Sequence, residues 1–258
     1  MPITVKSSRE IELMTEAGRI LEIVHKELEK ALHPGMTTKA IDRLGEEIIR
    51  SYGCIPSFLD YNGYPASICV SVNDEVVHGI PSEHRIIREG DIVSLDAGVI
   101  YKGYHSDAAR THCVGEVSKE AQNLVRVTRE CFFEGIKYAK EGNHLFDISG
   151  AIGRYAEERG YGVVRDLCGH GIGTALHEAP EIPNYEMKRK GVLLKAGMTL
   201  AIEPMINMGA RNVFQMADGW TIKTRDHLPA AHFEHTLAIR KGEADILSTF
   251  EYIEDRKL

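Results

Sequence analysis

The order of predicted elements occurs twice along this chain, and this repetition constrains the fold more than any other feature. In the first half, a capping box at Ser7-Ser8-Arg9-Glu10 begins a helix that ends at His33-Pro34-Gly35, and a second helix is expected over residues 38–52. Strand-like segments follow at 67–72, 91–100 and 104–114. In the second half, helices are expected at about 118–140 and 146–159, and strands at 162–166, 199–207 and 232–240. The chain therefore predicts a duplicated α/β unit.

Three short signatures recur in the same order in both halves. His78-Gly79-Ile80 returns as His170-Gly171-Ile172, Gly90-x5-Asp96 as Gly197-x5-Glu203, and Asp107-x7-Gly115-Glu116 as Glu234-x7-Gly242-Glu243. Each match alone is weak, and chance remains an alternative for any one pair. Together they favour a single catalytic domain over residues 1–258, with an internal repeat at about 7–116 and 118–243 and halves related by a pseudo-twofold axis.

The stretch from Gly90 to His112 predicts a hairpin that carries one aspartate in each strand. A turn centred between Tyr101 and Lys102 places Asp96 directly opposite Asp107. Directly opposed side chains share a face, with Cβ atoms about 4.5–5.5 Å apart, so two carboxylates there repel each other. The pseudo-twofold axis would bring Glu203 and Glu234 to the same place.

Four converging carboxylates require cations, because burying unpaired negative charge is costly. Two divalent ions about 3.5–4 Å apart would satisfy them, in a geometry that suits hydrolysis. Simpler readings exist: Asp96 could be a turn residue, Asp107 could pair with Arg110, and the acidic residues could form a salt-bridge network. Glu203 and Glu234 lie inside apolar strands, where unpaired Glu is rare, and they favour the metal site.

A histidine between glycines, His170, is a candidate nitrogen ligand. Taken alone it could be structural, but the nearby His177 and the repeat with His78 favour function. Carboxylates with one imidazole favour Mn, Fe, Co or Zn over metals that prefer sulfur. No Gly-x-Ser-x-Gly elbow is present, and Cys168 is interpreted as a packed free thiol.

Composition excludes several other classes. A net charge of −7 gives no reason to expect nucleic-acid binding. No apolar run reaches the roughly 18 residues that span a bilayer, so no membrane association is expected. Five cysteines without a Cys-x-x-Cys pair indicate neither a disulfide framework nor a cysteine zinc site, and a cytoplasmic location is expected.

Several segments, in order along the chain, resemble the type I methionine aminopeptidases of the short bacterial form. They are "YNGYPASICVSVNDEVVHGIP", "GDIVSLDAG", "GYHSDAARTHCVGE", "GHGIGTALHEAP", "GMTLAIEPMI" and "FEHTLAI". The resemblance implies the pita-bread fold, an α/β (α+β) arrangement of two halves with antiparallel sheets around a dinuclear metal site and helices outside. It also implies removal of the initiator methionine from nascent chains whose second residue is small.

The resemblance further implies roles for individual residues. Asp96 would chelate one of two divalent ions (Co, Mn, Fe or Zn), Asp107 and Glu234 would bridge both, and His170 and Glu203 would complete the other. Glu203 would carry a proton from water to the leaving amine. His177 would stabilise the tetrahedral intermediate, and His78 would hydrogen-bond the substrate near the scissile amide.

The implied methionine pocket comprises Tyr61, Tyr64, Cys69 and Trp220, whose rings and sulfur suit a thioether. Its wall departs from the commonest bacterial pattern, since Phe58 replaces a frequent cysteine, Asn62 a frequent histidine and Leu176 a frequent aromatic residue. The expected partners are nascent N-termini, with transient ribosome association, and the expected state is a monomer. Two alternatives are an Xaa-Pro aminopeptidase of the same fold and a binding protein that has lost its metal ions.

Overall fold

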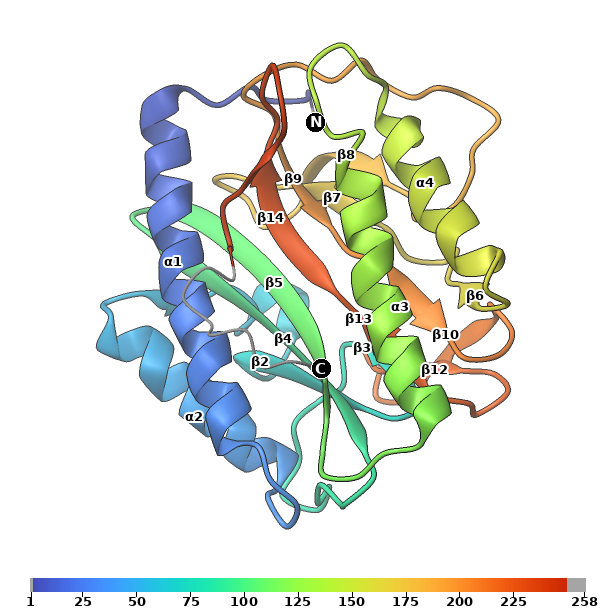
Figure 1. Ribbon diagram of the computed structural model, residues 1–258. Coiled ribbons are helices and arrows are strands. Elements are labelled where there is room, and N and C mark those ends of the chain that lie inside the picture. Colours follow the sequence, from blue (N-terminus) through green and yellow to red (C-terminus); the bar gives the residue numbers. More distant parts are fainter. Residues whose placement is uncertain (1, 250–258) are drawn as a thin grey trace.

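The computed structural model describes residues 2–249 and contains two α/β halves that meet along a shared sheet (Figure 1). The first half contains α1 (Ser8–Ala31), α2 (Thr38–Ser51), β1 (Ile55–Pro56), a 3-10 turn η1 (Tyr61–Gly63), β2 (Ile68–Val72), β3 (Glu75–Val77), β4 (Ile92–Tyr101) and β5 (Tyr104–Cys113). The second contains α3 (Lys119–Ile136), α4 (Leu145–Glu157), β6 (Gly162–Val163), β7 (Gly169–Gly171), β8 (Glu178–Ile182), β9 (Thr199–Ile202), β10 (Met205–Asn207), β11 (Val213–Gln215), β12 (Ile222–Thr224), β13 (Ala230–His232), β14 (Glu234–Ala238) and β15 (Asp245–Ile246).

A nine-stranded sheet joins the halves. Its order is β1-β4-β5-β14-β9-β7-β8, with β2 paired to β4 and β15 to β14, and every pair is antiparallel. The β5–β14 pairing crosses from one half to the other, and these two strands lie side by side at the centre of the molecule (Figure 1). Helix α1 packs on β4 and β5, whereas α3 packs on β5, β10 and β13. The mixed α/β architecture with outer helices is therefore confirmed.

Helix starts follow the signals in the sequence. Ser7 caps α1 and Glu10 closes the capping box, as predicted, and Ser118 caps α3 by accepting from the Ala121 amide. The predicted ends of the second-half helices are too late, because α3 stops at Ile136 and α4 at Glu157. Helix ends depend on tertiary packing as well as on local propensity, so they are harder to read from sequence.

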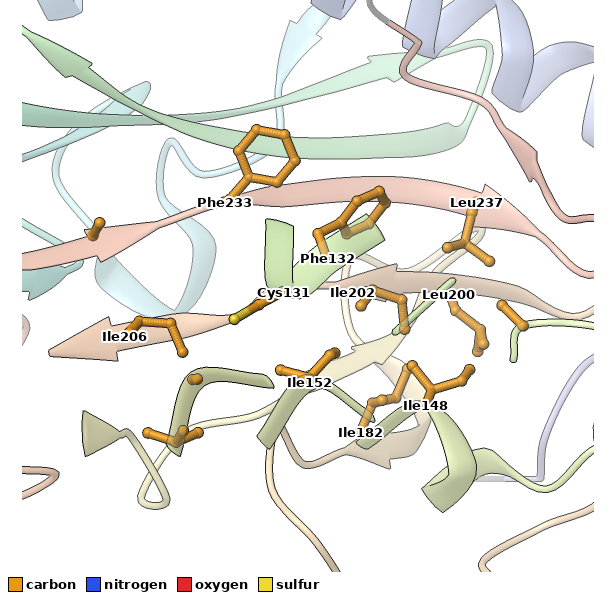
Figure 2. Close-up of a cluster of buried hydrophobic side chains, with 14 of the residues drawn as sticks. Cys131, Phe132, Ile148, Ile152, Ile182, Leu200, Ile202, Ile206, Phe233 and Leu237 are labelled. Carbon is orange, nitrogen blue, oxygen red and sulfur yellow. The ribbon is translucent and has the colours of Figure 1, made fainter. Parts of the chain in front are cut away.

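A large apolar cluster holds the second-half helices on the sheet. The ring of Phe132 on α3 packs against that of Phe233, and Ile148 and Ile152 of α4 lie near Ile182, Leu200 and Ile202 of the strands (Figure 2). The apolar surface of its fully buried members is removed from contact with water, and this drives the docking of α3 and α4. A matching cluster lies under α1 and α2 in the first half. The two helix layers thus fix the sheet from one side.

The predicted register of the central hairpin is wrong by two residues. Asp96 pairs with Ala109, and Asp107 pairs with Gly98. The turn consists of Lys102 and Gly103, both with positive φ (48° and 85°), as the tight two-residue hairpin turn requires. Because a shift of two residues keeps every side chain on its face, the two aspartates still share one face as diagonal neighbours.

Two strands predicted as continuous are interrupted at corresponding points. The segment 199–207 divides into β9 and β10 around Glu203-Pro204, and 232–240 divides into β13 and β14 at Phe233. Proline has no N–H to donate to a ladder, which explains the first break. The Phe233 amide donates to the Pro204 carbonyl, so the two breaks lie against each other. Among residues 2–249, no helix is both long and apolar enough to cross a membrane.

Candidate active site

One cavity is lined by all thirteen residues to which the sequence assigned a site role. They are Phe58, Tyr61, Tyr64, Cys69, His78, Asp96, Asp107, His170, Leu176, His177, Glu203, Trp220 and Glu234. Its other lining residues are Asn62, Val77, Leu167, Cys168 and Met205. Cys168, interpreted from sequence as a packed thiol, is half-buried and contributes to this wall.

The sheet register arranges the acidic residues in a row. Asp96 of β4 pairs with Ala109 of β5, and Ala109 pairs with Glu234 of β14. The β14–β9 register pairs His235 with Ile202, so its next position brings Glu203 opposite Glu234. Three carboxylates thus lie along one line across adjacent strands, and the small side chain of Ala109 lies between Asp96 and Glu234.

A second row lies two residues away on the same face. Asp107 of β5 exchanges hydrogen bonds with the Thr236 hydroxyl through its backbone N–H and C=O (2.8 and 2.9 Å). Thr236 pairs with Ala201, and Ala201 pairs with His170 of β7. Small side chains between the polar ones leave space where the carboxylates and the imidazole meet. The alternative partner for Asp107 is excluded, because Arg110 lies on the helix side and pairs with Glu22 of α1 at 2.5 Å.

His170 presents a nitrogen lone pair to the carboxylates. Its Nδ1 lies 2.9 Å from the Gly171 carbonyl, which can only accept, so Nδ1 carries the proton. The Nε2 atom therefore bears the lone pair, and it lies 3.7 Å from Glu203 Oε1 and 3.9 Å from Asp107 Oδ2. A lone pair facing two carboxylates is repulsive unless a cation lies between them.

Three oxygens of the cluster also lack donors. Asp96 Oδ1, Asp107 Oδ1 and Glu234 Oε1 are buried and receive no hydrogen bond from any residue between 2 and 249. Asp107, His170 and Glu234 each offer an atom within 4.8 Å of the others. Hard oxygens with one borderline nitrogen, buried and unsatisfied, fit a divalent first-row cation.

Burial raises the pKa of every carboxyl group in the cluster. The pKa of Glu203 rises to about 8 through burial, and that of Asp96 to about 7 through burial and the Glu203 charge. Burial and neighbouring carboxylates raise the pKa of Asp107 and of Glu234 well above their ordinary values. Burial, with His177 nearby, lowers the pKa of His170 to about 3, so the ring is neutral at pH 7. Without cations this cluster holds protons, which a divalent ion would displace.

The two further histidines stand at the cavity wall. His177 stacks against His170, with ring centroids 4.2 Å apart, and its Nδ1 lies 2.6 Å from the Tyr61 hydroxyl. His78 follows β3 with a positive φ of 59°, and its ring lies at 6.3 Å from that of Trp220. Burial lowers the pKa of both histidines, to about 4 for His78. Both are therefore neutral groups that can donate or accept one proton.

Aromatic and sulfur groups form the remainder of the cavity. Tyr64 packs edge-on against Trp220 at 5.1 Å, and its hydroxyl donates to the Gly79 carbonyl at 2.9 Å. With its hydroxyl already bonded, Tyr64 contributes an apolar ring. Cys69 pairs with Asp96 across β2 and β4, so the thiol sits beside the acidic row.

Sequence reasoning missed His232, which is buried with its Nε2 at 3.7 Å from Glu203 Oε2 and 4.0 Å from Glu234 Oε2. The available signal was its place two residues before Glu234, since alternate residues of a strand share a face. A break at Phe233 separates the two residues into different strands, so the signal was ambiguous.

Comparisons with known proteins agree with this arrangement. A model of metallopeptidase family M24 matches residues 12–241. The chain is 51% identical over 249 residues to a methionine aminopeptidase of Clostridium acetobutylicum, covering 96% of this chain and 100% of that one. It superposes on the crystal structure of a Thermotoga maritima methionine aminopeptidase with a TM-score of 0.94 and 45% identity, covering 96% and 100% of the two chains. An Xaa-Pro dipeptidase of Bacillus anthracis shares the fold with a TM-score of 0.77 and 25% identity, and 62% of that longer chain is covered.

Proposed function

This chain belongs to metallopeptidase family M24, and we propose from that premise that it is a methionine aminopeptidase that hydrolyses the peptide bond after an N-terminal methionine. One observation carries the proposal: three buried carboxylates, the half-buried Glu203 and a neutral imidazole line the same cavity as an aromatic and sulfur-containing wall. The first set of groups suits metal-dependent hydrolysis, and the second suits a thioether side chain. The proposal treats the chain as one catalytic domain with its repeat at about 7–116 and 118–243.

Two divalent ions are proposed, drawn from Co, Mn, Fe and Zn. Asp96 would hold one ion, His170 and Glu203 the other, and Asp107 and Glu234 both. When bound, such ions acidify water and neutralise negative charge that develops on a carbonyl oxygen. The orphaned oxygens of Asp96, Asp107 and Glu234 and the lone pair of His170 support these assignments.

Glu203 is proposed to move the proton in the reaction. Its carboxyl lines the cavity beside His170, and once deprotonated it can accept a proton at Oε from the attacking water and deliver that proton to the leaving amine. Proton transfer of this kind contributes about 10²–10⁴-fold to a rate.

His177 and His78 are proposed to bind the reacting amide. The Tyr61 hydroxyl lies 2.6 Å from His177 Nδ1 and is proposed to donate its hydrogen to that nitrogen. His177 Nε2 then carries the proton and can donate it to a carbonyl oxygen that becomes negative. His78, held by its positive-φ backbone next to Trp220, would hydrogen-bond the substrate near the same amide.

The substrate is proposed to be the N-terminus of nascent chains with a small second residue. Phe58, Leu176 and Trp220 would surround the methionine side chain, together with Tyr61, Tyr64 and Cys69. A cytoplasmic location, a monomeric state and transient ribosome association remain predictions.

The test is a cleavage assay of metal-reconstituted protein with Met-Ala-Ser, Met-Leu-Ser and Ala-Pro-Ala. Cleavage of Met-Ala-Ser alone supports the proposal, and cleavage of Ala-Pro-Ala would support an Xaa-Pro peptidase instead. N-acetyl-Met-Ala-Ser serves as a control that should remain intact, because a blocked amine cannot join the site. No cleavage with any of the four metals would indicate a binding role.

A further inference from the structure

His232 is an imidazole at the metal centre that the proposed mechanism does not use. It ends β13, its side chain is 2% exposed, and its Nε2 faces carboxylate oxygens of Glu203 and Glu234 at 3.7 and 4.0 Å. Glu203 therefore lies between two imidazoles, because His170 Nε2 is also 3.7 Å from its other oxygen.

The backbone of His232 is fixed by the first half of the chain. Its N–H donates to Thr111 Oγ1 at 2.9 Å, and the Thr111 hydroxyl donates to its carbonyl at 3.0 Å. Ser94 contacts the same hydroxyl at 2.8 Å, and β13 also pairs with β10 through Met205. Such a tether, from a neighbouring strand, holds the ring at one place relative to the carboxylates.

The ring nitrogens of His232 lack hydrogen-bond partners among residues 2–249. Neither nitrogen of His232 has a hydrogen bond to any described residue, although both are buried. Leaving a buried donor unpaired costs about 1–3 kcal/mol, so such a group usually serves a purpose.

His232 differs from His170 in how its proton is placed. The Gly171 carbonyl fixes the proton of His170 on Nδ1, so the Nε2 lone pair faces the cluster. A ligand atom of His170 lies within 4.8 Å of ligand atoms of Asp107 and Glu234, as expected of a metal ligand. No backbone carbonyl accepts from His232 Nδ1 within residues 2–249, so Nε2 is available to carry the proton. Separations of 3.7 and 4.0 Å exceed a direct hydrogen bond, and a small side-chain rotation would bring the groups within range.

We propose that His232 is a positioning residue of the metal centre, whose Nε2–H donates to the carboxylates of Glu203 and Glu234 after a small side-chain rotation and holds them in the orientation that binds divalent ions. The inference rests on the proposed function in taking those carboxylates as metal ligands. Groups that hydrogen-bond to metal ligands typically contribute 10–100-fold to metal affinity.

The test is calorimetric titration of metal-free protein with Mn²⁺, which does not depend on peptidase activity. His232→Leu, which removes both nitrogens at similar volume, should weaken Mn²⁺ binding by about 10–100-fold. His232→Gln retains an N–H donor and should bind within a few-fold of the unchanged protein. His112→Leu makes the same change on β5 beside Arg110, away from the cavity, and should leave the affinity unchanged. Thermal unfolding of each metal-free variant checks its fold, and His232→Met replaces His232→Leu if that variant does not fold.

Two results would overturn the proposal. Equal Mn²⁺ affinity in His232→Leu and the unchanged protein would exclude any role at the metal centre. A His232→Gln variant that binds Mn²⁺ as weakly as His232→Leu would show that N–H donation does not set the metal affinity. A changed Co²⁺ absorption spectrum of that variant would then identify His232 as a metal ligand. If His232→Leu weakens Mn²⁺ binding while Met-Ala-Ser is never cleaved, the proposed function fails and this inference stands.

Discussion

Loading the metal-free protein with Mn²⁺ should release protons, and their number follows from the buried carboxyl groups. With a pKa of about 8, Glu203 is about 0.9 protonated at pH 7, and Asp96, with a pKa of about 7, is about half protonated. Burial and mutual repulsion also raise the pKa values of Asp107 and Glu234 well above their ordinary values. His170 adds nothing, because its pKa of about 3 leaves it neutral. Since carboxylates must be deprotonated to bind metal, at least about one proton per chain should leave at pH 7.

The assay is calorimetric titration in two buffers of different ionisation enthalpy, whose heats differ in proportion to the protons released. The count should fall as the pH rises above 8, where Glu203 is already ionised. Glu203→Gln is the matched variant, since it removes one titrating group at constant size and should lower the number of protons released at pH 7. Identical heats in both buffers would refute the argument, because the carboxyl groups would then be ionised before any metal arrives.

Four further outcomes are expected. Asp107→Asn should abolish cleavage of Met-Ala-Ser and tight binding of the second ion, and near-full turnover would contradict the bridging role. His177→Ala should lower kcat by about 10²–10³-fold with unchanged metal content, whereas loss of metal would show that its role is wrongly assigned. Tyr61→Phe should lower kcat by up to about 100-fold, because it releases His177 Nδ1, and an unaffected rate would exclude that contact. Glu22→Ala leaves the buried Arg110 without its 2.5 Å partner and should lower stability by about 3–5 kcal/mol, a fall in Tm of about 6–20 °C, while metal affinity stays constant.

The metal-free protein should also lose stability as the pH rises. Its cluster carboxyl groups have folded-state pKa values above their unfolded values, so the folded chain binds more protons between about pH 4 and 8. Stability from these groups is complete below that window and declines through it. Thermal unfolding from pH 7 to 8 measures the decline, because the buried histidines, whose pKa values burial lowers, are largely neutral in the folded and the unfolded chain over that range. Saturating Mn²⁺ should reduce the decline, and a metal-free Tm that rises from pH 7 to 8 would contradict the sign.

Features that depend on neighbouring residues could be predicted from the sequence. The capping box at Ser7, the Ser118 cap and the hairpin around Lys102-Gly103 each arise from contacts within a few positions. The acidic residues stood out because carboxylates are rare inside apolar strands. The resemblance to methionine aminopeptidases added individual roles, and the family relationship agrees with it.

Other features depended on pairing between distant strands. The hairpin register could not be predicted from an assumed turn centre between Tyr101 and Lys102. The turn consists of Lys102 and Gly103, and this shifts the register by two positions. The breaks at Pro204 and Phe233 form where the two strands approach each other, and neither segment shows that alone.

The sequence by itself determined the mixture of helices and strands, the helix starts and the kinds of group available for chemistry, since local backbone preferences and side-chain type settle those. Only the tertiary structure decided which groups meet. It aligned Asp96, Glu234 and Glu203 across adjacent strands, turned Arg110 away to Glu22, and brought His232 beside the carboxylates. Strand register between distant segments sets these neighbours, and it is fixed by the packing of the whole sheet against its helices.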